Sequence, residues 1–223
     1  PDIHMMDSGW TVPFILRNQT VNLTERLPDE TLQYVNDNYL EASLETARAP
    51  QGGDLHALPL FPDLGFTLYR QDLIEDAGYD TGGWATDPPR WEEFSAAIRD
   101  ARDQAGLDYG FTTQAAAYEG LSCCTFNEVM TSWGGAYYGG ADNLFTAGDR
   151  PITVDDQRVI DAIRMMRSFI AGEEEYTLDG YPQICPSAIV QWTEQQSLNP
   201  FAAGDAVANR NWSYAIAATG TDA

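Results

Sequence analysis

LPLFPDLGFTLYRQDL, residues 58–73, is almost continuously apolar but carries Pro62 and Asp63 at its centre. An ordinary core strand avoids both residue types. Proline removes a hydrogen-bond donor from the sheet, and an unpaired buried carboxylate is costly. The stretch therefore needs a special explanation, and the rest of the chain supplies it.

The composition is that of a globular and strongly acidic protein. Of the 223 residues, 43% are hydrophobic and 12% aromatic, enough for one large domain or two modest lobes. The net charge is −22, from 34 acidic residues against 12 basic ones, and every basic residue is arginine. An acidic surface without lysine indicates adaptation to molar salt, where the screening length shrinks to about 3 Å. No basic stripe is present, which argues against nucleic acid as a partner.

The cysteines and histidines do not predict a metal site. Cys123, Cys124 and Cys185 lack the spacing of metal ligands, and the only histidines are His4 and His56. We therefore expect neither a metal nor another cofactor. Adjacent cysteines pair only with strain, so two alternatives stay open: a bridge from Cys123 or Cys124 to Cys185, or buried free thiols.

Helical and strand-like segments alternate along the chain, which is typical of an α/β architecture. Apolar periodicity and turn residues predict strands over 2–6, 109–113 and 206–209, and helices over 29–39, 72–77, 91–101, 119–133 and 153–170.

No pattern in the sequence indicates catalysis. A nucleophile elbow, a phosphate-binding loop and an HExxH motif are all missing from the sequence, so we expect a protein that is not an enzyme. What recurs is an aromatic residue beside a hydrogen-bonding residue at the end of an element. Sugars present apolar ring faces and rings of hydroxyls, which suit aromatic platforms with carboxylate acceptors. The candidate ligand-binding residues are Asp7, Trp10, Asp63, Tyr118, Glu119, Trp212 and Tyr214. For Trp84, Trp91 and Trp192 we expect core packing instead.

Several motifs occur in a characteristic order. They are Asp7-Ser8-Gly9-Trp10, residues 58–73 followed by Ala77-Gly78-Tyr79-Asp80, Pro89 with Trp91-Glu92-Glu93-Phe94, Tyr118-Glu119-Gly120-Leu121, Trp133-Gly134-Gly135, and 201–207 followed by Trp212-Ser213-Tyr214. In this order the chain resembles the extracellular solute-binding proteins of sugar ABC transporters, the group that contains the maltose- and trehalose-binding proteins. Ser213 departs from the family pattern, which usually has proline at that position.

The resemblance implies a type II periplasmic-binding-protein-like α/β fold, with two lobes joined by hinge strands and the first lobe only partly present. Residues 1–61 would belong to lobe I and 62–223 to lobe II, with the hinge crossover near 58–64. A hinge at this point would account for the proline and the carboxylate within residues 58–73. Pro59 and Pro62 would stiffen a hinge strand, and Asp63 would emerge at the cleft wall. The chain begins at Pro1 without Met, and we expect it to be a piece of a longer protein.

The implied function is a receptor that captures a di- or oligosaccharide of the maltose or trehalose kind and delivers it to membrane permease subunits. Such a receptor would be extracellular, a lipoprotein anchored by an N-terminal segment absent from this sequence. The alternatives are a carbohydrate-acting hydrolase and a surface interaction protein without a small ligand. Sequons at Asn18 and Asn22 leave glycosylation open, whereas a glycan at Asn211 conflicts with a binding role for Trp212.

Overall fold

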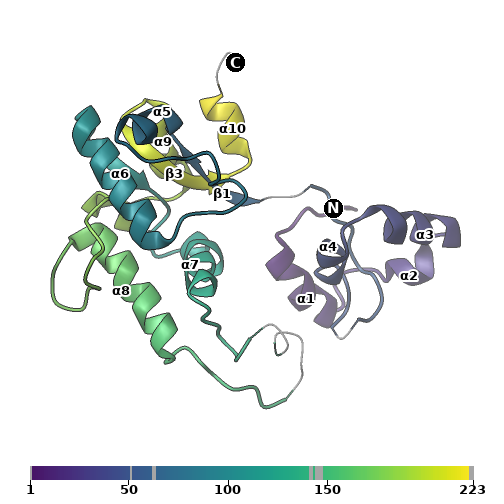
Figure 1. Ribbon diagram of the computed structural model, residues 1–223. Coiled ribbons are helices and arrows are strands. Elements are labelled where there is room, and N and C mark those ends of the chain that lie inside the picture. The colour runs from purple at the N-terminus through teal and green to yellow at the C-terminus, as the bar shows by residue number, and fades with distance from the viewer. Residues whose placement is uncertain (1, 51, 62–63, 141–142, 144–147, 221–223) are drawn as a thin grey trace. The chain divides into compact units, whose positions relative to one another are not determined.

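The computed structural model describes residues 2–50, 52–61, 64–140, 143 and 148–220 (Figure 1). The chain divides into two compact units: unit 1 is Pro1–Pro62 with Asp142–Asp149, and unit 2 is Asp63–Ala141 with Arg150–Ala223. In the described ranges, no helix is long and apolar enough to cross a membrane.

Unit 1 consists of short helices around a small core. The helices are α1 (Ser8–Leu16), α2 (Leu23–Arg26), α3 (Asp29–Asn38) and α4 (Glu41–Glu45). The prediction of a helix after Pro28 is confirmed, because α3 has Asp29 and Glu30 in its first turn, where carboxylates favour the helix dipole. The buried apolar residues of this unit form a cluster of Val35, Leu44, Ala47 and Leu55.

The predicted strand over residues 2–6 is wrong. This segment forms no strand, and Ile3 and Met5 are exposed. The chain enters helix α1 instead, because Asp7 caps it: the Asp7 carboxylate accepts a hydrogen bond of 2.7 Å from the backbone N–H of Gly9.

Unit 2 contains a three-stranded sheet covered by helices (Figure 1). The strands are β1 (Gly65–Tyr69), β2 (Tyr109–Thr112) and β3 (Ala206–Trp212), in the order β1-β3-β2. Strand β3 pairs antiparallel with β1 and parallel with β2. The other elements are α5 (Gln71–Asp76), α6 (Trp91–Ala105), the π-helix η1 (Gly120–Thr125), α7 (Phe126–Ser132), α8 (Gln157–Ala171), the 3-10 helix η3 (Ser187–Gln191), α9 (Glu194–Ala202) and α10 (Tyr214–Thr219).

The central strand β3 presents different chemistry on its two faces, as alternation along a strand requires. The Asn209 side-chain amide donates to the backbone carbonyl of Ser197 at 2.9 Å, so this residue faces α9. Arg210 points to the opposite face, where its guanidinium meets Glu128 of α7. All of β3 from Ala206 to Asn211 is buried, so the side chains on both faces of the strand are enclosed by neighbouring elements.

The core of unit 2 joins α6 and α8 to the sheet. Ile98 and Met165 are completely buried in a cluster that also contains Phe111 and Val207. The prediction that Trp84, Trp91 and Trp192 are packing residues is confirmed, since all three pack against this cluster. Helix α8 begins later than predicted because Asp156 caps it, accepting from the backbone N–H of Arg158 at 2.9 Å.

The predicted helix over 119–133 is confirmed, but its first turn is the π-helix η1. The structure also decides between the two cysteine alternatives: the bridge to Cys185 is wrong, and the buried free thiol is confirmed for Cys185 alone. Cys123 is bonded to its neighbour Cys124, and Cys185 is a buried free thiol. Cys185 lies in the core, held by a 2.7 Å hydrogen bond from its backbone N–H to the carbonyl of Phe169. Burial raises the pKa of the Cys185 thiol, so it stays protonated and unreactive.

Candidate functional site

A buried arginine organises the carboxyl end of strand β3. The Arg210 Nε donates to Glu128 Oε2 at 2.8 Å, its Nη2 donates to Glu128 Oε1, and its Nη1 donates to Gln114 Oε1 at 3.2 Å. The arginine side chain is only 5% exposed, so the forked contact with Glu128 compensates a charge removed from water. Gly65 makes room for the pair, because a Cβ there would collide with Arg210 Nη2 and lie 2.6 Å from Glu128 Oε1.

The same arginine covers one face of Trp212. Its guanidinium carbon lies 3.9 Å from the centre of the Trp212 ring, a cation–π contact between residues on one face of β3. Trp212 is half-buried at the end of the strand. A flat ligand ring that stacks on this indole therefore has to use the face opposite Arg210.

Tyr118 is held beside the end of β3 through the first residue of α9. The Tyr118 hydroxyl donates to Glu194 Oε1 at 2.8 Å, and the backbone carbonyl of Glu194 accepts from the Asn211 amide at 3.2 Å. Burial is the main cause that raises the pKa of Tyr118. The hydrogen bond to Glu194 is the second cause, and the nearby Tyr214 raises the pKa further. The hydroxyl therefore remains a donor at neutral pH. Gly120 permits this arrangement, because a Cβ there would collide with the Tyr118 hydroxyl and lie 2.9 Å from Cε2.

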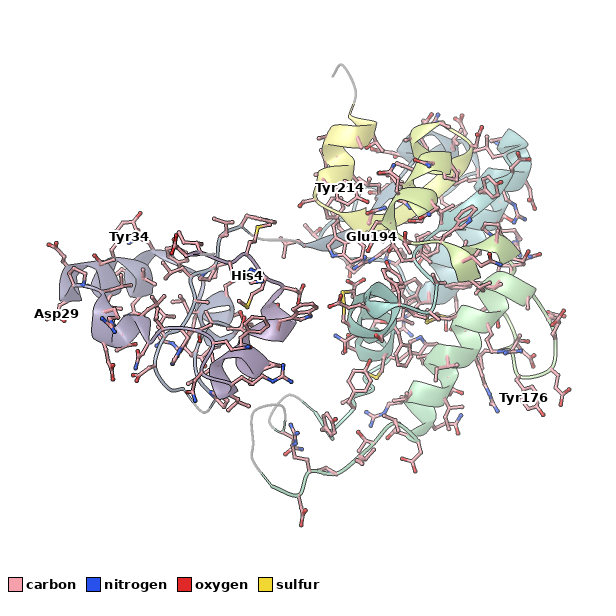
Figure 2. The ribbon with its side chains drawn as sticks, turned by 180° about the vertical axis from the view of Figure 1, so that it is seen from behind. His4, Asp29, Tyr34, Tyr176, Glu194 and Tyr214 are labelled. Atoms are coloured by element: carbon pink, nitrogen blue, oxygen red, sulfur yellow. A yellow bond between two sulfur atoms is a disulfide. The ribbon has the colours of Figure 1, made fainter. Side chains whose placement is uncertain are left out.

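Helices α9 and α10 bring Glu194 and Tyr214 to this end of the sheet. Figure 2 labels Glu194 at the start of α9 and Tyr214 at the start of α10, two helices that contact each other. Helix α9 is fixed by a capping box, in which Gln196 bonds back to the side chain and backbone of Thr193. Its first turn therefore holds the Glu194 carboxylate in place for Tyr118.

The structure brings together only part of the predicted site. Tyr118, Trp212 and Tyr214 lie at the carboxyl end of β3 in unit 2, and the exposed Glu119 precedes η1. Asp7 caps α1 of unit 1 and Trp10 lies within that helix, whereas Asp63 lies outside the described residues.

The two residues of unit 1 have local roles of their own. The Asp7 carboxylate is engaged by its cap hydrogen bond. Trp10 is 53% exposed and stacks on Phe14, with 6.5 Å between the ring centroids. A role of either residue in binding stays a prediction.

Sequence reasoning missed Arg210, Glu128, Gln114 and Glu194. A signal for Arg210 was available, because it stands in AVANRNW, residues 206–212, in a chain with only 12 basic residues. An arginine within a buried strand needs a carboxylate partner. Nothing in the sequence singled out Glu128 among 34 acidic residues, and its role follows only from the fold.

The structure also bears on the sequons. Asn211 is fully buried and its amide is bonded to Glu194, so the folded chain presents no glycan acceptor there. Asn18 is exposed, while the Asn22 amide donates to Asp54 at 2.6 Å. In the part of the chain that the structure describes, no three metal-binding side chains cluster.

Comparison with known proteins gives several matches. No protein-family model matches the chain. A Deinococcus radiodurans protein named "Probable ABC transporter-binding protein" is 25% identical over 224 residues, covering 97% of this chain and 45% of the relative. The chain thus spans less than half the length of this curated relative.

Comparison with solved structures identifies the fold of the chain. A maltose-bound MalE3 of T. maritima superposes with a TM-score of 0.70 at 25% identity, covering 91% of this chain and 44% of that one. A sugar transporter protein of Arthrobacter chlorophenolicus A6 with bound laminaribiose gives 0.68 at 16% identity, covering 96% and 47%. The comparisons support a relationship to the sugar-binding proteins of ABC transporters. The fold of this chain is that of the type II periplasmic-binding-protein-like sugar-binding proteins.

Proposed function

We propose that this chain forms part of the substrate-binding receptor of an ABC transporter, and that the receptor captures a di- or oligosaccharide of the maltose or trehalose kind. The observation that carries the proposal is that Tyr118, bonded to Glu194, lies with Trp212 and Tyr214 at the carboxyl end of β3. Flat rings beside carboxylates suit the alternating apolar faces and hydroxyls of pyranosides.

In the proposed site the ligand ring stacks on the free face of Trp212, while Glu119 and Glu194 accept hydrogen bonds from its hydroxyls. Arg210 keeps the indole in place from the other side. Residues 1–61 supply lobe I, with Asp7 and Trp10, and residues 62–223 supply lobe II. The ligand selects the closed state because only closure lets both lobes contact the sugar.

The crossover near 58–64 acts as the hinge in this proposal, and Asp63 contributes a further acceptor. The loaded receptor delivers its sugar to permease subunits in the membrane. The protein works outside the cell, held by an N-terminal anchor as a lipoprotein. The net charge of −22 supports work at high salt, where repulsion between its carboxylates is screened.

Calorimetric titration of the full-length protein in molar KCl with maltose, trehalose and laminaribiose tests the proposal. We expect saturable binding of at least one sugar, and a loss of affinity of about tenfold or more in Trp212→Ala because the stacking surface is gone. Trp192→Phe is the matched control. Trp192 packs edge-on against Tyr109, with 5.9 Å between the ring centroids, and its substitution should leave the affinity unchanged.

Two results would contradict the proposal. Binding that weakens equally in both variants would show that Trp212 is not a platform. Release of new reducing ends from maltose would instead favour the hydrolase alternative, which needs two carboxylates facing each other across the sugar.

A further inference from the structure

Two neighbouring cysteines of the π-helix η1, Cys123 and Cys124, are joined by a disulfide. A disulfide stabilises a fold mainly by restricting the unfolded chain, and its effect grows with the length of the loop that it closes. The bridge in η1 joins residues that are adjacent in sequence, so it connects no distant parts of the molecule. Cross-linking the fold is therefore not its role.

The bridge is accessible from solvent. Cys123 is exposed and Cys124 is half-buried, whereas Cys185 is 3% exposed and lies in the core. Thiol–disulfide exchange begins when a thiolate attacks one of the two sulfur atoms, so it requires such access. Exposed disulfides are more easily reduced than buried ones and are often regulatory. The Cys123–Cys124 bridge thus has the exposure of a reversible redox site.

The bridge lies on the same helical face as a residue of the proposed sugar site. Glu119 precedes η1 with helical backbone angles, φ −54° and ψ −49°. A π-helix closes its hydrogen bonds between residues five positions apart, so residues four and five positions apart lie on one face. Cys123 and Cys124 follow Glu119 by four and five positions. The two cysteines are therefore one helical turn from the carboxylate proposed to accept a sugar hydroxyl.

The same π-helix continues into the helix that carries Glu128. The backbone at Phe126 is helical, φ −69° and ψ −40°, so η1 passes directly into α7. Glu128 in α7 binds the guanidinium of Arg210, which in turn covers Trp212. A change in the backbone of η1 therefore acts on Glu119 at one end and on α7 at the other.

We propose that Cys123–Cys124 is a reversible redox modification site that sets the affinity of the neighbouring sugar site, an inference that rests on the proposed function. In the oxidised form, the ring that contains both sulfur atoms restricts the backbone torsions of η1 and holds Glu119 in place before a ligand arrives. Reduction frees these torsions. A sugar then has to order them when it binds, which lowers the affinity.

The reductant in this proposal is a dithiol. One of its thiolates attacks the sulfur of the exposed Cys123, the S–S bond breaks, and the sulfur of Cys124 leaves as a thiolate that takes up a proton. The second thiolate of the reductant attacks the mixed disulfide and releases the sulfur of Cys123, which is protonated in turn. The reductant becomes a cyclic disulfide, and the protein has gained two electrons and two protons.

The first measurement is independent of any sugar. The folded full-length protein in molar KCl is reduced with dithiothreitol, freed of the reagent under argon, and its accessible thiols are titrated with dithiobis(nitrobenzoate). We expect reduction to expose two more thiols in the wild-type protein than in the double variant Cys123→Ser, Cys124→Ser. The peptide that contains both cysteines should gain about 2 Da on reduction, the mass of two hydrogen atoms.

The second measurement is calorimetric titration with maltose, trehalose and laminaribiose. The affinity for a bound sugar should fall about threefold to tenfold on reduction and return on re-oxidation. The double variant should bind like the reduced wild-type protein and should not respond to dithiothreitol. Cys185→Ala is the control, because it keeps the bridge and should keep the full response. The urea midpoint should be the same in both redox states, because the bridge closes no long loop.

The outcomes separate this inference from the proposed function. If sugar binds but reduction exposes no extra thiols, the redox site is wrong and the receptor stands. If the thiols appear and the affinity does not change, the bridge does not act on the sugar site. A fall in affinity together with a lower urea midpoint would show that the bridge supports the fold instead. If the thiols appear and no sugar binds in either state, the proposed function fails, and this inference fails with it.

Discussion

The two units of this chain are held together in different ways. The described residues of unit 2 include a single cluster of sixteen buried residues that ties two long helices to a sheet. The corresponding cluster in unit 1 contains four residues. Unit 1 depends more on caps and on single hydrogen bonds, such as those that Leu55 makes with Thr24 and Leu23, at 2.8 and 2.7 Å. The residues of the candidate site with the tightest geometry are all in unit 2, where a large core fixes the elements that carry them.

The largest effect should come from the core of unit 2. Ile98→Ala leaves a cavity at a completely buried position and should lower the free energy of unfolding by about 2–5 kcal/mol. Urea unfolding followed by tryptophan fluorescence reports mainly unit 2, because Trp10 is the only tryptophan of unit 1. Leu55→Ala in unit 1 should leave this transition nearly unchanged. Equal shifts in the two variants would show that the two units unfold together, which contradicts the expectation that each unit is stabilised by its own core.

The next effect should come from the charge buried in β3. Glu128→Gln leaves the guanidinium of Arg210 without its carboxylate and should cost about 2 kcal/mol. Asp72→Asn is the matched control, because Asp72 pairs with Arg70 at 2.6 Å on the surface and such pairs contribute roughly 0–1 kcal/mol. Chemical unfolding of both variants at the same salt concentration measures the difference. Equal losses would mean that burial of Arg210 does not set the strength of its pair.

The contrast between units also explains which features the sequence predicted. The helices around Phe94 and Val159 were predicted because each presents an apolar stripe at helical spacing to a large core. The strand over 2–6 failed because alternation of apolar residues predicts a strand only where a neighbouring strand is available. Ile3 is 90% exposed.

The candidate site was predictable to a smaller extent. Aromatic residues beside polar ones drew attention to Tyr118 and Trp212. Glu194, the partner of Tyr118, lies 76 residues away along the chain and carries no local signal. Arg210 carries a signal of its own, but its contact with Trp212 follows only from the structure. The glycine at position 65 acquires its meaning only when β1 pairs with β3 and the Arg210 side chain fills the space. Contacts set by strand register and by burial cannot be deduced from spacing along the chain.

A smaller effect is expected at the cap of α1. Asp7→Ala removes the acceptor for the Gly9 N–H and should destabilise unit 1 by about 1 kcal/mol, whereas Asp7→Asn keeps a capping side chain and should cost less than half of that. Hydrogen exchange of the α1 amides measures the loss locally. The pair of variants also separates two roles: sugar affinity lost in both would come from the charge, and sugar affinity lost only with alanine would come from the helix.

The smallest change is spectroscopic and concerns tyrosines of unit 2. Burial, then a hydrogen bond to a carboxylate, raise the pKa of both Tyr118 and Tyr181, the partners being Glu194 and Glu92. A folded-state pKa above the unfolded value of about 10 means that the stabilising contribution is complete below pH 10 and is lost as the pH rises through the folded pKa. Titration of phenolate absorbance should therefore show a late fraction that ionises only as unit 2 unfolds. Tyr118→Phe should reduce this late fraction. If Tyr118→Phe reduces only the early fraction, then Tyr118 is open to solvent, and the tight packing of unit 2 does not extend to the candidate site.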